Sequence, residues 1–236
     1  LHAQGGQERT VTGDENLNKG AFSKMVNKYT WALGLLAAVA VALVLVPSAG
    51  ADITGSAHDF SAETWNTGGE ICAPCHTPHN ADTTVTDAPL WDHAVTTETF
   101  TVYDSDTLDA TVSAPAGVSK LCLSCHDVTR GLDSFGGATG TNVITGDADL
   151  GTDLNGHHPV SFTYDATLVT ADGELNATTA SSGLGGTISA DMLFGTSSDQ
   201  MECASCHDVH RKDETTSSLL VMDNADSALC LTCHDK

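Results

Sequence analysis

The chain has 236 residues and carries 31 acidic side chains against nine lysines and arginines, which gives a formal net charge of −22. A surface this acidic repels nucleic acid and anionic membranes and favours cationic partners or divalent ions. We therefore expect no nucleic-acid partner. The length allows one domain or two small ones.

The first residues have the layout of a secretory signal. Met25 and Lys28 precede an apolar run over residues 31–46, and Ala49 and Ala51 form a small-residue cleavage site. The alternative is a membrane anchor, but the apolar run is shorter than the roughly 20 residues that span a bilayer. We expect residues 1–24 to be upstream sequence or a mis-assigned start, residues 25–51 a cleaved signal peptide, and residues 52–236 the exported domain, with no membrane insertion after cleavage.

Four cysteine pairs dominate the remaining sequence. Two residues separate the cysteines of each pair, and a histidine follows each pair directly. Histidine accounts for only 11 of the 236 residues, so four such followers are not a chance pattern. CxxCH is typical of covalent haem c attachment. The predicted thioether residues are Cys72, Cys75, Cys122, Cys125, Cys203, Cys206, Cys230 and Cys233, and the predicted proximal iron ligands are His76, His126, His207 and His234.

The spacing explains these residue types. Cysteines at positions i and i+3 and a histidine at i+4 share one face of a helical turn, where they reach two vinyl groups and the iron. A zinc site explains paired cysteines but not a histidine after every pair. A disulfide framework and a thioredoxin-like redox motif fit the spacing less well. We therefore predict four haem c groups, with a short helix at each motif.

The motifs also form an internal repeat. CAPCHTPH at 72–79 resembles CASCHDVH at 203–210, and SKLCLSCHD at 119–127 resembles SALCLTCHD at 227–235. A unit of two motifs therefore occurs twice, with spacers of unequal length. Duplication of a two-haem unit is the simplest origin of this pattern.

The sequence between the motifs predicts little regular structure. Residues 131–156 and 171–190 are rich in Gly, Thr, Asp and Ser and indicate loops. The alternating stretches at 99–104 and 161–165 predict short strands. The expected fold class is a multihaem cytochrome c, mostly coil, with short helices at the CxxCH motifs and a few strands around a continuous haem stack. Haem would supply the apolar bulk that the chain lacks.

Each iron needs a second axial ligand on its other face. Met192, Met201 and Met222 would give His/Met ligation at higher potential, but histidine is numerous enough for all four irons. We expect bis-histidine haems of low potential. Four of five candidates are predicted as distal ligands: His58, His79, His93, His158 and His210.

His210 places a constraint on haem spacing. It follows His207 by three residues, so on a helix the two rings lie side by side, about 5 to 6 Å apart. Such neighbours cannot approach one iron from opposite sides. His210 therefore binds the iron of a second haem or none, and His79 stands in the same relation to His76. If they are ligands, haems must lie close together.

The motifs SAHDFS, GGEICAPCHTPHN, APLWDH, SKLCLSCHD, GHHPVSFTY, MECASCHDVH and ALCLTCHDK follow one another in this order. Together they resemble the doubled-CxxCH multihaem cytochromes, most nearly the four-haem extracellular nanowire type from metal-reducing bacteria called the OmcE type. The resemblance covers residues 52–236. It implies a loop-built fold around a continuous haem stack, subunits polymerised in a helical filament, and a histidine from one subunit on a haem of the next. Near the mature N-terminus, His58 is the expected inter-subunit ligand.

Three functions remain open from the sequence. The first is electron transfer through a chain of haems, in an extracellular filament or at the cell surface, with redox proteins or extracellular acceptors as partners. The second is a monomeric periplasmic carrier with the same haems. The third is a multihaem reductase, but the exported region has only 9 − 4 = 5 basic residues with which to bind an anionic substrate. We therefore expect no enzymatic activity.

Overall fold

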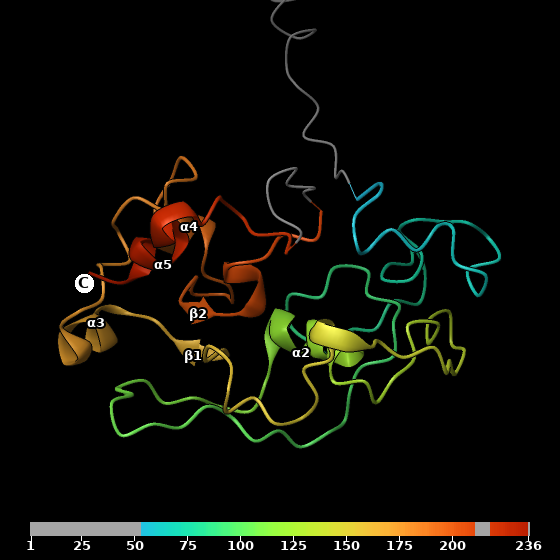
Figure 1. Ribbon diagram of the computed structural model, residues 1–236, viewed down its shortest axis with the longest axis horizontal. Coiled ribbons are helices and arrows are strands. Elements are labelled where there is room, and N and C mark those ends of the chain that lie inside the picture. The colour runs from blue at the N-terminus through green and yellow to red at the C-terminus, as the bar shows by residue number, and fades with distance from the viewer. Residues whose placement is uncertain (1–52, 211–217, 236) are drawn as a thin grey trace, which may run out of the picture. The chain divides into compact units, whose positions relative to one another are not determined.

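The computed structural model describes residues 53–210 and 218–235. The predicted upstream sequence and signal peptide lie outside the described residues. Most of the described chain is coil, with short helices and one two-stranded sheet (Figure 1). The elements are α2 (Gly117–His126), η1 (Gly146–Ala148), β1 (Phe162–Thr163), α3 (Ala166–Asp172), α4 (Ile188–Asp191), β2 (Gln200–Met201), η2 (Cys203–Ser205), η3 (Ala225–Ser227) and α5 (Ala228–Cys233). This agrees with the predicted mixture of coil, short helices and few strands.

The expected strand at 161–165 forms in part, and the one at 99–104 does not. Strand β1 pairs antiparallel with β2, and Phe162 faces Met201. Within 99–104 only Thr101 makes a bridge, to Asp153. Its N–H donates to the carbonyl of Thr152 at 2.9 Å, so a loop takes the hydrogen bonds that a partner strand would need. The loop prediction for 131–156 is confirmed apart from the single turn η1.

One small hydrophobic core surrounds the sheet. It is formed by Phe162, Tyr164, Leu168, Ile188, Leu193 and Met201. Helix α3 presents Leu168 to this core and begins at Asp165, whose carboxylate accepts hydrogen bonds from the N–H groups of Thr167 and Leu168. Cys233 packs against the same core. The core therefore supports the last CxxCH motif directly.

No helix within the described ranges is long and apolar enough to cross a membrane.

Candidate haem-attachment sites

At three of the four motifs a backbone hydrogen bond shows the turn that the spacing requires. The histidine N–H donates to the carbonyl of the first cysteine, at 2.9 Å from His76, 3.1 Å from His207 and 3.0 Å from His234. The second motif lies within α2 and the fourth in and after α5. The third begins as η2, and the first is a turn that includes Pro74, which has no N–H to donate. The predicted helix is therefore found at the second and fourth motifs. The first and third motifs form short turns instead.

The first and third motifs are held in the same way, which confirms the internal repeat. In each, a downstream segment runs antiparallel to the motif and forms a clasp around its histidine. The matching bonds are Asp92 N–H to Cys75 O and Val221 N–H to Cys206 O, both 2.9 Å, and Thr77 N–H to Leu90 O and Asp208 N–H to Leu219 O, both 2.8 Å. Two segments far apart in sequence therefore form equivalent local structures.

The proximal histidines are prepared to bind a metal. Nδ1 of His76, His126 and His207 lies 2.9, 2.8 and 2.7 Å from a backbone carbonyl oxygen. A carbonyl can only accept, so each Nδ1 carries the proton and donates it. The lone pair is then on Nε2, which is the tautomer and ring orientation that a ligating histidine needs.

Three of the four histidines in the CxxCH motifs, those at 76, 126 and 234, lie opposite a second histidine from a distant part of the chain. The ring centroids lie 6.1 Å apart for His58 and His126, 6.0 Å for His76 and His210, and 6.4 Å for His158 and His234. Two imidazoles on opposite sides of one metal, each bonded at about 2 Å, have ring centres roughly 6.3 Å apart. The residues present therefore fit an axially ligated haem iron between each pair.

His58 has further properties of a buried ligand. Burial, followed by the charges of His126, His207 and His210, lowers its pKa to about 4. The ring is therefore neutral at neutral pH, as metal binding requires. Its Nδ1 is buried without a hydrogen-bond partner. Since the ring lies across from His126 of the same chain, the geometry favours a ligand within the chain over the inter-subunit role expected from the sequence.

The other predicted ligands lie in different environments. His93 is only 2 % exposed, and its Nδ1 and Nε2 lie 3.0 and 2.9 Å from the carbonyl oxygens of Ala94 and Gly131. A neutral imidazole has one N–H, so the ring can donate to only one of these carbonyls at a time, and Cys125 Sγ lies 3.4 Å from Nε2. His79 is exposed and belongs to none of the ring pairs in the described chain, and neither does His207. His157 is exposed beside His158, which is the one of the two that faces His234.

Cysteines of consecutive motifs lie near one another. The Cys122 thiol contacts that of Cys203. This contact, and next burial, raises the pKa of Cys122 well above its usual range, and the same contact lowers the pKa of Cys203 although burial opposes that shift. Burial, and next the charge of Cys75, raises the pKa of Cys125 to about 12. Burial, and next Cys230, raises that of Cys206 to about 11. Each pair of consecutive motifs therefore has cysteines close enough to interact.

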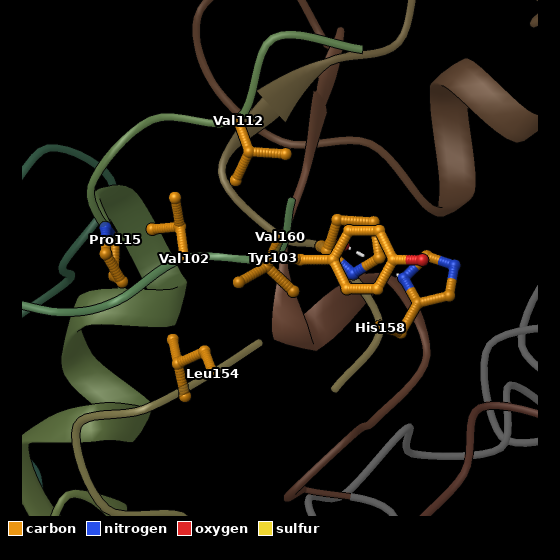
Figure 2. Close-up of a pocket in the computed structure, with 8 residues that line it drawn as sticks. Val102, Tyr103, Val112, Pro115, Leu154, His158 and Val160 are labelled. Atoms are coloured by element: carbon orange, nitrogen blue, oxygen red, sulfur yellow. Dashed lines mark hydrogen bonds between the residues drawn. The ribbon is translucent and has the colours of Figure 1, made fainter. Parts of the chain in front are cut away.

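An apolar pocket lies next to His158. Figure 2 shows its lining, which includes Val102, Val112 and Leu154 from separate segments, with His158 at one side. Residues 99–104, which do not form the expected strand, contribute Val102 and Tyr103 to this lining. The wall beside His158 is therefore mainly apolar. Sequence patterns did not identify this pocket, because its residues come together only through loop folding.

The fourth motif is tied to the core by two polar side chains that sequence analysis missed. The Tyr164 hydroxyl donates to the carbonyls of Asn176 at 2.6 Å and Cys233 at 3.3 Å. The Asn176 amide donates to the carbonyls of Leu231 and Thr232 at 3.2 and 3.1 Å. These bonds satisfy carbonyls at the end of α5 that have no partner within the helix. Neither residue has a sequence signal that would indicate this role.

Replacing Tyr164 by phenylalanine is expected to destabilise the protein by about 1 kcal/mol, because the hydroxyl donates to buried carbonyls. The midpoint of thermal unfolding should fall by roughly 3 °C, measured by calorimetry. Tyr103→Phe is the matched control, since no hydrogen bond of its hydroxyl is found within the described chain. Equal midpoints for the two variants would contradict this role of Tyr164.

A zinc cluster has no counterpart in this arrangement. Across residues 53–210 and 218–235, no three or more His, Cys, Asp or Glu side chains converge in a group that could hold a metal ion.

Comparison with known proteins supports the haem interpretation for the C-terminal part. The sequence model of the doubled CXXCH motif matches residues 197–236, which contain the third and fourth motifs. No curated protein matches the chain. The match covers well under half of the residues, and the first two motifs repeat the same pattern outside it. The doubled CXXCH motif indicates covalently bound haem c and supports a multihaem c-type cytochrome.

Proposed function

We propose that this protein transfers electrons through a chain of four closely packed haem c groups, one at each CxxCH motif. The observation that carries the proposal is the spacing of three histidine pairs, with ring centroids 6.0 to 6.4 Å apart. When bound, haem supplies an iron that exchanges one electron between its ferric and ferrous states. The protein holds each group covalently and supplies its axial ligands.

The proposed ligand sets combine distant parts of the chain. His76 pairs with His210, His126 with His58, and His234 with His158. His207 is the remaining proximal ligand, and His79 is the candidate for its distal partner, because His93 is buried beside the carbonyls of Ala94 and Gly131. Since His210 follows His207 by three residues, one short segment holds ligands of two irons. Those two haems must lie close together.

Two axial histidines at each iron argue against an enzyme. A reductase needs one open or weakly held coordination position and groups that bind its substrate. Only five lysines and arginines lie after residue 51, which is a poor inventory for holding an anion such as nitrite. We propose that the protein carries electrons and does not turn over a substrate.

We further propose that copies polymerise into an extracellular filament, with His79 of one copy on the iron held by His207 of the next. This is supported by the exposure of His79 and by the lack of a ring partner for His207 among the described residues. The alternative is a monomeric periplasmic carrier in which His79 reaches His207 of the same chain.

The proposed chain of haems, each with two axial histidines, predicts four haems that are all low-spin. Mass spectrometry of the purified protein should give the polypeptide mass plus four haems, and electron paramagnetic resonance should show low-spin ferric signals with little high-spin signal. A substantial high-spin fraction in the intact protein would favour the reductase. Fewer than four haems would contradict the assignment of one haem to each motif.

The filament proposal is tested by removing one ligand. His79→Ala should abolish filaments in negative-stain microscopy, while His157→Ala should leave them unchanged, because His157 faces no proximal histidine in the described structure. A wild-type protein that stays monomeric would support the periplasmic carrier. Filaments that persist in His79→Ala but vanish in His58→Ala would return the inter-subunit role to His58.

A further inference from the structure

The second and third motifs meet at a buried polar cluster. The Cys122 thiol contacts the Cys203 thiol, and the Cys203 N–H donates to Ser119 Oγ at 2.9 Å. These cysteines belong to different motifs, so their contact marks where the two attachment sites come nearest. The contacts between the two motifs therefore set the distance between these attachment sites.

Glu202 joins the two motifs through the start of α2. This ten-residue helix begins after Ala116, which provides no side-chain cap. Instead Glu202 Oε2, from the residue just before the third motif, accepts from the Ser119 N–H at 3.2 Å and from Ser161 Oγ at 3.1 Å. Ser119 is the third residue of α2, whose N–H has no acceptor within the helix. The third motif therefore caps the helix that carries the second.

The surrounding structure is built to receive this carboxylate. Glu202, Ser119 and Ser161 are 4 %, 0 % and 5 % exposed. The Ala116 N–H donates to Ser161 Oγ at 3.0 Å, which orients that hydroxyl toward Glu202. Gly117 has φ +48, and a Cβ there would lie 3.0 Å from Glu202 Oε1. Glycine at this position leaves space for the Glu202 carboxylate.

Glu202 is also a buried acid without a basic neighbour. No lysine, arginine or histidine forms an ion pair with it among the residues described, so only N–H and O–H donors solvate its charge. A negative charge next to two haem attachment points opposes the addition of an electron there. Its interaction is strong because little water screens it at a buried site.

We propose that Glu202 is a positioning residue: it holds the second motif against the third, so that haems attached at Cys122 and Cys203 would be kept close enough to exchange electrons. The inference rests on the proposed function. It assigns Glu202 two effects, a structural link made by its oxygen and a lowering of the reduction potentials of the two adjacent haems made by its charge.

Two substitutions separate these effects in the holoprotein. Glu202→Gln keeps an oxygen that accepts from Ser119 and Ser161 but removes the charge. Two of the four potentials should shift to more positive values in a spectroelectrochemical titration, while the thermal midpoint stays near that of the wild type. Glu202→Leu removes both features, so the same two potentials should shift and the midpoint should fall. Glu98→Gln is the control, because Glu98 is exposed.

Gly117→Ala provides an independent test that keeps the charge. The added methyl group should displace the Glu202 carboxylate from Ser119, so the same two reduction potentials should change. This variant still tests the role of Glu202 if Glu202→Leu does not fold. If four low-spin haems are attached and the potentials are unchanged in both Glu202→Gln and Gly117→Ala, the proposed role of Glu202 is overturned. The proposed function is not affected by that result. Missing or high-spin haems in the wild type would instead overturn the proposed function.

Discussion

Replacing His210 by alanine is expected to convert one haem in four from low-spin to high-spin. Its ring centroid lies 6.0 Å from that of His76, so the variant removes one of the two axial ligands proposed for the iron of the first motif. The fold should survive, because His210 is an exposed side chain whose only polar contact in the described structure is with Asp208. Electron paramagnetic resonance of the oxidised protein measures the change directly.

The matched control for His210→Ala is His157→Ala, which removes an exposed histidine outside the ring pairs and should leave the spectrum unchanged. His158→Ala should reproduce the high-spin signal at the fourth motif, since that ring faces His234 at 6.4 Å. A wild-type spectrum for His210→Ala would show that the pairing with His76 is not ligation.

Loss of the first haem is expected to loosen the N-terminal part of the chain far more than the core. The twelve buried hydrophobic side chains all lie between Leu121 and Leu229, so none of them is in residues 53–120. We expect a bound haem to supply much of the apolar contact of that segment. In Cys72→Ala/Cys75→Ala, amide hydrogen exchange over residues 53–100 should be at least about tenfold faster, equivalent to ~1.4 kcal/mol of local opening free energy.

Exchange in the core over residues 162–201 should change little in the same protein, because Phe162, Tyr164 and Ile188 pack against one another without the first motif. The reciprocal control is Cys230→Ala/Cys233→Ala. Cys233 contacts the core, so this variant should speed exchange at 162–201 and spare residues 53–100. Uniform effects across the chain in both variants would contradict separate haem-dependent segments.

Local features were predictable because they depend on neighbours in sequence. CxxCH places three functional side chains within five residues, so one turn suffices to align them, and the hydrogen bonds at His76, His207 and His234 show that turn. The repeat was equally visible, because equivalent residues make equivalent bonds in the clasps of the first and third motifs. Coil was predictable where Gly, Thr, Asp and Ser replace a hydrophobic pattern.

The fate of 99–104 shows the limit of such patterns. Its alternation suits a half-buried strand, but a strand needs a partner edge, and residues 152–154 bond Thr101 as a loop instead. Its apolar side chains then line the pocket beside His158. The strand prediction was therefore wrong for this segment.

The sequence by itself determined the candidate haem-attachment residues, the twofold repeat and the constraint that His207 and His210 cannot share an iron, since all three follow from spacing along the chain. Only the tertiary structure decided that His210 faces His76, that His58 faces His126 and that Glu202 caps α2. Each of these contacts joins residues separated by long loops. Closing a long loop costs entropy that varies only slowly with its length, so spacing does not select the partner. Packing and hydrogen bonding make that selection.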